Sequence, residues 1–358
     1  MAIPNGVPRL HSIQALRGLA AFAVMAFHFT AGNSNFMAKL PALGVLFIHG
    51  DLGVWMFFTI SGFVIPHAMQ AIEYRVDRDG LRFFLRRLVR LEPPYAVSVF
   101  IALAASYVAT LSPAYRGAAP HVDLTTFLVQ FFYVGPWFDR PWINVVAWTL
   151  AIEFQYYLLM LFVAPLLLSR SKFWITVFFV FAFAATLMIT DDRAVFLYLP
   201  LFAPGFSAFL FYRRAVSSVG FLALLGACCL INFYQRGLPQ MIIALVSALL
   251  ILVPLRRPLP MLGALGTISY SLYLVHLPIG QRIINLTMRF QDVPLQLLGL
   301  TLAVAASLGV AWALWFFVER SSIACAKHWF QIGARHGSTI SEGISDQAGL
   351  EPKPIAGA

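Results

Sequence analysis

Charge is scarce in this chain. Asp, Glu, Lys and Arg make up 11% of its 358 residues, whereas soluble domains average about 25%. Hydrophobic residues account for 60% of the sequence, and the mean hydropathy is +0.79. This composition excludes an ordinary soluble domain and is typical of a protein that crosses a membrane several times.

Cysteine is also nearly absent. The chain has Cys228, Cys229 and Cys325, too few for a disulfide framework and without the spacing of a metal site. We therefore expect no metal and no tightly bound cofactor. The first apolar segment lacks a small-x-small processing site, so we expect no cleavable signal. We also find no internal repeat of the kind that many transporters carry.

Ten apolar segments each approach the ~20 residues that a helix needs to cross the hydrocarbon layer. We predict an all-α polytopic membrane protein with about ten transmembrane helices. A weaker apolar stretch at 124–138 contains Pro136 and is predicted to be a re-entrant or interfacial helix. The predicted spans are 13–30, 45–66, 94–112, 143–168, 173–190, 194–212, 217–234, 239–255, 263–285 and 295–318.

Basic residues collect in alternate loops, among them 75–90, Arg213-Arg214 and Arg256-Arg257. Cytoplasmic loops carry an excess of Lys and Arg, so we predict that both the N- and C-termini are cytoplasmic. The net charge of +10 then reflects topology and anionic membrane lipids, and it does not indicate nucleic-acid binding. We predict one membrane domain over 1–330 and a disordered cytoplasmic tail over 331–358, which is rich in Gly, Ser, Ala and Pro.

Two ionisable residues share one face of the first span. Arg17 and His28 are eleven residues apart, a distance that advances a helix by about 16 Å and turns it by about 1100°. Ionisable groups within a span indicate a functional site, and an imidazole can act as a general base. The alternatives are a helix–helix hydrogen bond for His28 and a snorkelling anchor for Arg17.

A basic segment precedes the third span. Arg82, Arg86 and Arg90 recur at every fourth position beside Arg87, and the pattern predicts an amphipathic helix on the cytoplasmic surface. Guanidinium groups suit phosphate recognition, although attraction to anionic lipid explains the same pattern. In the second span Ser61-Gly62 supplies one hydroxyl, and its alternative is a packing notch.

Polar residues also interrupt the fourth and ninth spans. Glu153, five residues after Trp148, is the only acid that we place deep in a span, and such a carboxylate must be paired or protonated. Ser269, Tyr273 and His276 form a polar stripe on one helical face, which either lines a cavity or joins helices. Glu319-Arg320 at the end of the tenth span is predicted to be an interfacial pair.

In this order, these blocks resemble the acyltransferase-3 family of integral membrane O-acyltransferases. Many members carry an acid two positions after the glycine that corresponds to Gly53 in the second span, where this chain has Trp55. The resemblance covers residues 12 to about 320. Its blocks are Arg17 with ten residues before His28, Phe57-Phe58-x-x-Ser61-Gly62-Phe63, Arg86-Arg87-x-x-Arg90 followed by Pro93, Trp148-x-Leu-x-x-Glu153, and Ser269-Tyr270-Ser271-Leu272-Tyr273-Leu274-x-His276.

The resemblance implies a bacterial inner-membrane enzyme that takes an acyl group, most often acetyl, from cytoplasmic acyl-CoA. The implied acceptor is a hydroxyl of a cell-surface glycan or glycolipid. It also implies that Arg17 and His28 are essential. We expect His28, Glu153 and His276 to be catalytic. We expect substrate contacts from Arg17, Arg82, Arg86, Arg87, Arg90, Ser61, Trp148, Ser269 and Tyr273.

Two mechanisms and two rival functions stay open at this point. His28 either deprotonates the acceptor or carries the acyl group transiently. A glycolipid transporter or flippase would use the same residues for binding and relay. Another class of membrane acyltransferase is disfavoured, because the chain contains no His-x-x-x-x-Asp and no Asp-His-His-Cys motif.

Overall fold

The computed structural model describes residues 11–111 and 122–328, and no strand occurs within these ranges. The predicted tail at 331–358 lies outside them. The elements are α1 (His11–Phe29), α2 (Ser34–Lys39), α3 (Pro41–Val45), α4 (Leu52–Gln70), α5 (Val76–Thr110), α6 (Leu124–Phe131), η1 (Gly135–Phe138), α7 (Ala147–Leu168), α8 (Lys172–Met188), η2 (Val195–Tyr198), α9 (Leu199–Tyr212), α10 (Ser218–Arg236), α11 (Leu238–Ile251), α12 (Pro260–Val275), the π-helical η3 (His276–Gln281), α13 (Arg282–Thr287), α14 (Val293–Leu314) and the π-helical η4 (Trp315–Glu319).

Within the described residues, eight helices are long and apolar enough to cross a membrane, and the protein is a multi-pass membrane protein. Two more predicted spans correspond to α8 and α11, which have 17 and 14 residues and fall short of a full crossing length. The cytoplasmic placement of the termini stays a prediction. The eight are His11–Phe29, Leu52–Gln70, Val76–Thr110, Ala147–Leu168, Val195–Tyr212, Ser218–Arg236, Pro260–Thr287 and Val293–His328.

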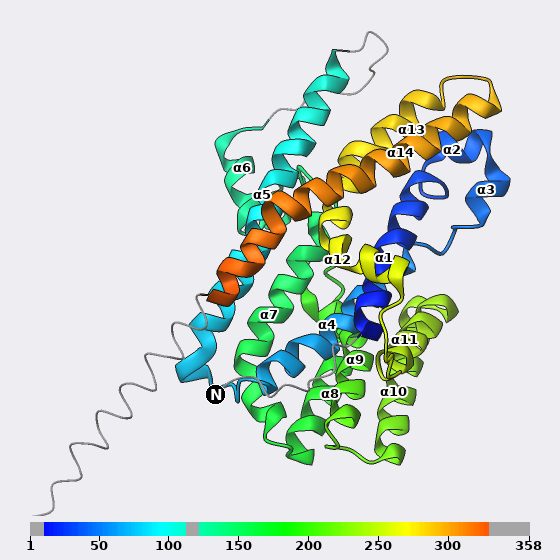
Figure 1. Ribbon diagram of the computed structural model, residues 1–358. Helices are drawn as coiled ribbons and strands as arrows, with labels where there is room; N and C mark the ends of the chain where they lie inside the picture. Colours follow the sequence, from blue (N-terminus) through cyan, green and yellow to red (C-terminus); the bar gives the residue numbers. More distant parts are fainter. Residues whose placement is uncertain (1–10, 112–121, 329–358) are drawn as a thin grey trace, which may run out of the picture.

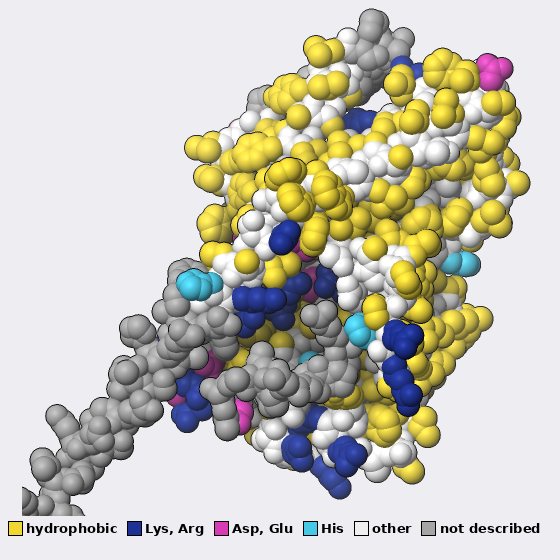
Figure 2. All heavy atoms as spheres, in the orientation of Figure 1, with side chains coloured by type: hydrophobic (Ala, Val, Ile, Leu, Met, Phe, Trp, Pro, Cys, Tyr) yellow, Lys and Arg dark blue, Asp and Glu magenta, His cyan; other side chains and the backbone are white. Residues whose placement is uncertain are grey.

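The bundle has a buried centre and an apolar outer face. Figure 1 shows α1, α4, α7 and α12 crossing in its middle, with α5 and α14 as long rods beside them. Hydrophobic side chains cover much of the visible surface in Figure 2, while Lys and Arg side chains gather in a few patches. Exposed residues such as Phe173, Phe181 and Leu230 suit contact with lipid tails, because the hydrocarbon is as apolar as they are.

The prediction of a separate basic helix on the membrane surface is wrong. Residues 81–91 are the first half of α5, which continues without a break through the third span. Pro93 and Pro94 lie inside this helix. A proline within a membrane helix removes backbone donors without ending the helix when neighbouring groups compensate. Phe83 is buried in the bundle, so the basic segment packs against protein and does not lie flat on lipid.

Two other predicted boundaries also shift. The second span begins at Leu52 and not at residue 45, because α3 and a series of turns precede it. Gly50, in these turns, lies so close to α1 that an added Cβ would collide with the Ala23 carbonyl. The weaker stretch at 124–138 forms α6 and η1, and at 8 and 4 residues neither is long enough to span the membrane.

Glycines allow α1 and α12 to approach closely. A Cβ on Gly18 of α1 would collide with the Leu262 carbonyl, and one on Gly266 of α12 would collide with the Gln14 carbonyl. The Gln14 amide also donates to the Gly263 carbonyl at 3.0 Å and to the Thr267 hydroxyl at 2.8 Å. Small residues and interhelical hydrogen bonds hold membrane helices together, since apolar burial does not distinguish helix from lipid.

We expect Gly266→Ala to destabilise the protein by about 1–3 kcal/mol, because an extra methyl group in a filled interface forces the backbones apart. Gly226→Ala is the matched control: Gly226 is also inside a helix, but no atom lies within 4 Å of its added Cβ. Thermal unfolding in detergent, followed by size-exclusion chromatography, measures the difference. Equal midpoints for the two variants would contradict the close contact.

Candidate active site

A cavity of about 140 Å³ lies at the centre of the bundle. It is bounded by side chains from α1, α4, α5, α7 and α12, which are far apart in the sequence. Its volume is below the roughly 300–1,000 Å³ of a pocket for a drug-sized ligand. The cavity is lined by Ile13, Arg17, Val54, Phe57, Phe58, Ile60, Ser61, Val64, Ile65, Arg87, Arg90, Leu91, Thr149, Leu150, Glu153, Tyr157, Ser269, Tyr270 and Tyr273.

The carboxylate of Glu153 is held in the cavity wall by two hydroxyl groups. Ser61 Oγ donates to Glu153 Oε1 at 2.7 Å, and Tyr157 Oη donates to the same oxygen at 2.6 Å. Tyr157 is one helical turn after Glu153 on α7, so both side chains lie on one face. These two short hydrogen bonds orient the carboxylate and offset part of the cost of burying it.

Three arginines line the same cavity: Arg17, Arg87 and Arg90. The Arg87 guanidinium lies over the Tyr157 and Phe83 rings, 5.1 and 5.3 Å from their centroids. Such stacking holds a cation in a dry site without neutralising it. The ion pairs within residues 11–111 and 122–328 are Arg75–Asp77, Arg78–Asp79, Arg140–Asp123 and Arg193–Asp191, and none of them involves a cavity residue.

Two further acids lie inside the bundle, so the prediction that Glu153 is the only deep acid is wrong. Glu319 is 2% exposed and accepts a 2.6 Å hydrogen bond from Ser271 Oγ on α12. The predicted Glu319–Arg320 interfacial pair does not form, because successive helical residues point in different directions. Arg320 instead lies over the Phe316 ring.

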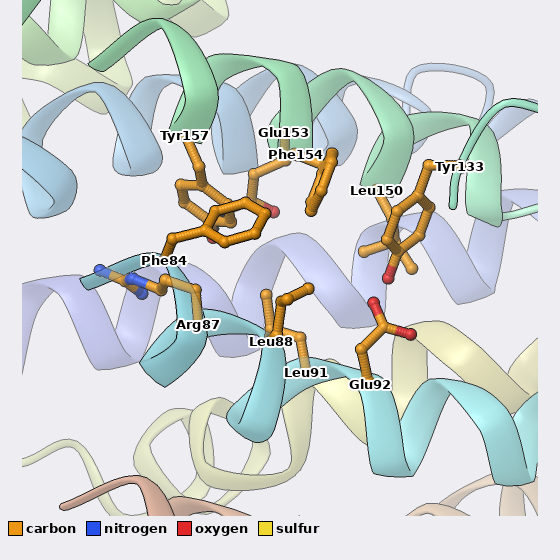
Figure 3. Close-up of a pocket in the computed structure, with 10 residues that line it drawn as sticks. All are labelled: Phe84, Arg87, Leu88, Leu91, Glu92, Tyr133, Leu150, Glu153, Phe154 and Tyr157. Atoms are coloured by element: carbon orange, nitrogen blue, oxygen red, sulfur yellow. Dashed lines mark hydrogen bonds between the residues drawn. The ribbon is translucent and has the colours of Figure 1, made fainter. Parts of the chain in front are cut away.

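Glu92 is the other missed acid. It lines a small side chamber of about 10 Å³, together with Arg87, Glu153 and Tyr157, which is room for about one water molecule. Figure 3 shows α5 and α7 facing each other across this chamber, with the Glu92 carboxylate directed toward the Tyr133 hydroxyl. The sequence did not single out Glu92 because it directly follows the basic segment, where an acid suggests a surface ion pair.

The two candidate histidines contact each other. His276 Nε2 lies 3.4 Å from His28 Nδ1, although the residues are 248 positions apart. His28 Nδ1 is 2.9 Å from the Val24 carbonyl, and His276 Nδ1 is 3.2 Å from the Leu272 carbonyl. A carbonyl oxygen only accepts, so these contacts assign the hydrogen to Nδ1 in both rings. Nε2 of His28 is then the unprotonated nitrogen.

The histidine pair is separate from the cavity lining. Tyr273 lines the cavity, and its ring centroid is 5.8 Å from that of His276. The Tyr273 hydroxyl shares a 2.7 Å hydrogen bond with Thr149. Tyr273 is thus the contact between the polar cavity and the histidines.

Besides His28 and His276, three predicted site residues do not line the cavity. Trp148 packs in a separate aromatic group, with ring centroids 6.4 Å from Trp55 and 6.0 Å from Tyr198. Arg82 is exposed, and Arg86 is half-buried outside the lining. Ser269 does line the cavity. Its hydroxyl is already used, since it donates to the Gly266 carbonyl at 2.9 Å.

No three His, Cys, Asp or Glu side chains within the described ranges gather as a possible metal site. The polar groups that the bundle does bring together are a carboxylate, three guanidinium groups and an imidazole pair. Guanidinium groups bind phosphates, and an imidazole accepts a proton from a hydroxyl. The arrangement suits transfer of a group to a hydroxyl from a donor molecule that also carries phosphates.

Comparison with known protein families decides which family this chain belongs to. The model of the acyltransferase domain of the acyltransferase-3 family matches residues 10–316. The chain belongs to the acyltransferase-3 family. This membership is the one that the sequence blocks predicted.

Curated relatives are similar over part of the chain. Acyltransferase MdmB of Streptomyces mycarofaciens is 30% identical over 165 residues, which are 44% of this chain and 39% of the relative. O-acetyltransferase OatA of Staphylococcus aureus is 31% identical over 177 residues, which are 45% of this chain and 26% of the relative. Peptidoglycan O-acetyltransferase OatA of Listeria monocytogenes is 32% identical over 166 residues, which are 41% of this chain and 23% of the relative.

Each alignment thus covers less than half of the relative's length. No solved structure matches the chain.

Tyr157 is a cavity residue that the sequence analysis missed, and its spacing of four from Glu153 was the available signal. We expect Tyr157→Phe to lower the acyl-transfer rate about 10- to 100-fold, because a hydrogen bond to a charged group contributes about 1.5–3 kcal/mol. Tyr212→Phe is the control, since Tyr212 packs against Phe63 and His67 away from the cavity. Rates per folded protein, measured with both variants, test this; a Tyr157→Phe rate equal to wild type would contradict it.

Proposed function

We propose that this protein transfers an acyl group, most simply acetyl, from acyl-CoA to a hydroxyl of a cell-surface glycan or glycolipid. The observation that carries the proposal is the polar cavity, which has three arginines and an oriented carboxylate beside a histidine pair. The family supplies acyl transfer as the reaction class. The relatives named O-acetyltransferase and peptidoglycan O-acetyltransferase support acetyl as the group and a glycan as the acceptor.

The size of the cavity constrains how the donor binds. About 140 Å³ accommodates the thioester end of the pantetheine arm and not a nucleotide. The phosphates then bind near Arg87 and Arg90 at the end of the cavity formed by α5, through charge-assisted hydrogen bonds. We place that end at the cytoplasm, in a bacterial inner membrane, in keeping with the predicted cytoplasmic termini and the bacterial relatives.

His28 supplies the base in this proposal. Its Nε2 takes the proton of the acceptor hydroxyl as the hydroxyl oxygen attacks the thioester carbonyl carbon. The carbon–sulfur bond then breaks, and the proton passes from His28 to the departing CoA thiolate, so the products are an ester and CoA thiol. Nδ1–H of His28 stays on the Val24 carbonyl and His276 Nε2, which stabilises the imidazolium.

Glu153 and the arginines have electrostatic roles. The Glu153 carboxylate faces the cavity with one oxygen bound by Ser61 and Tyr157, and its other oxygen is able to accept from a second hydroxyl of the acceptor, next to the one that His28 deprotonates. The charges of Glu153 and Glu319 both act on the Arg17 guanidinium. Arg17 lines the same cavity as Glu153, and in this proposal its positive charge stabilises the developing negative charge.

We expect His28→Ala to reduce acyl transfer about 100-fold or more, because general-base catalysis contributes about 10²–10⁴-fold. Membranes that contain each variant receive radiolabelled acetyl-CoA and a glycan extract, and label in glycan is counted. His328→Ala, which changes an exposed histidine near the end of the described chain, is the control and should match wild type. Equal labelling by His28→Ala would remove the base from the proposal. Glycan movement without label in any sample would favour a transporter.

We expect Arg87→Ala to raise the KM for acetyl-CoA about tenfold or more, since it removes a charge-assisted contact to phosphate. Arg82→Ala is a matched control on the same helix, because Arg82 is exposed and outside the cavity. Initial rates over a range of donor concentrations separate KM from kcat. The same KM in both variants would contradict phosphate binding at Arg87.

A further inference from the structure

The helix that carries His276 has an unusual hydrogen-bonding requirement just before the histidine. In an α-helix the Leu274 carbonyl accepts from the amide nitrogen four positions later, and that residue is Pro278, which has no N–H. The helix changes to π-helical geometry over His276–Gln281 at this point. A buried carbonyl without a donor is costly, and Pro278 leaves the Leu274 oxygen without its α-helical donor.

Asn144 supplies that donor. Its side-chain Nδ2 donates to the Leu274 carbonyl at 2.9 Å and to Ser98 Oγ at 3.1 Å. Because a carbonyl oxygen only accepts, it is the Nδ2 end of the Asn144 amide that points toward Leu274. Asn144 is 1% exposed and Ser98 is fully buried, so water does not compete for these bonds. One amide therefore joins α5, the segment before α7, and α12.

The position of His276 depends on this junction. Thr149 on α7 bonds the Tyr273 hydroxyl at 2.7 Å, so two consecutive residues of α12 are tied to the α7 segment just ahead of the histidine. On the other side, a Cβ on Gly280 would collide with the Phe29 ring and approach Ser307 Oγ. The π-helical segment is thus confined between α1 and α14, and its start is held by Asn144.

We propose that Asn144 is a positioning residue that sets the contact between His276 and His28 by satisfying the Leu274 carbonyl. Its effect on catalysis rests on the proposed function, in which His28 is the base and His276 accepts from its Nδ1–H. Without the Asn144 amide, the Leu274 carbonyl turns toward another donor and the 3.4 Å approach of the two rings is lost. The hydrogen bonds of Asn144 do not involve the arginines of the cavity.

The kinetic test uses two substitutions and their combination. We expect Asn144→Ala to lower kcat about 10- to 100-fold, the size of effect that a misplacement of about 1 Å produces, with the KM for acetyl-CoA within about twofold. Pro278→Ala introduces an amide N–H four positions after Leu274. The combination Asn144→Ala with Pro278→Ala should therefore recover most of the lost kcat. If Asn144→Ala does not fold, Asn144→Asp has nearly the same shape without the N–H donor and serves instead.

The second readout does not depend on catalysis. Histidine-selective ¹⁵N labelling, with His28→Ala and His276→Ala for assignment, reports the side-chain nitrogens of the pair directly. These resonances should move in Asn144→Ala and return toward wild-type positions in the combination. An unchanged kcat in Asn144→Ala, or unmoved resonances, would overturn the proposal, as would failure of Pro278→Ala to restore either readout. If wild type transfers no acyl group, the proposed function fails while the resonances still decide the role of Asn144.

Discussion

The site depends on the close packing of α1 against α12. Gly18 and Gly266 let the two backbones approach until an added methyl group on either would collide with the other helix. This packing places the face that carries Arg17 and His28 beside the face that carries Ser269, Tyr273 and His276. In a membrane, apolar burial gives no preference for protein over lipid, so small residues and interhelical hydrogen bonds must hold such a contact.

Buried charged groups of the bundle have neutral partners, which in the proposed function leaves the cavity arginines free to bind an anionic donor. Hydroxyl groups satisfy the acids: Ser61 and Tyr157 bind Glu153, and Ser271 binds Glu319. Aromatic rings hold Arg87. Had the acids and arginines of the cavity formed close ion pairs, an anionic donor would have to break them before it could bind. Hydroxyl groups at the two acids and aromatic rings at Arg87 avoid that cost.

The histidine pair shows how local and distant constraints combine. Pro278 interrupts the hydrogen bonding of its helix, and the change to π-helical geometry begins at His276. Such interruptions are frequent at functional sites. An amide from before α7 then satisfies the carbonyl that the proline leaves without a donor. The position of this imidazole is thereby set through a carbonyl two residues before it, which a side chain 130 positions from that carbonyl binds.

The sequence alone determined the class of the protein and much of its site. Hydropathy identified the helical bundle, because each span must satisfy its own backbone in lipid. The spacing of Arg17 from His28 and the stripe through Ser269, Tyr273 and His276 predicted shared helical faces. In the structure His28 contacts His276, while Arg17, Ser269 and Tyr273 line the cavity. Motifs along one helix are readable because helical periodicity is local.

Tertiary structure decided which of these residues meet and which do not. Trp148 and Arg82, both predicted to contact substrate, lie outside the cavity, whereas Tyr157 and Asn144 proved to be central contacts. The basic segment and the third span form one helix, which continues through Pro93 and Pro94. Contacts between helices depend on their packing angles and on small residues at the crossings, and those are set by the whole bundle and not by any single segment.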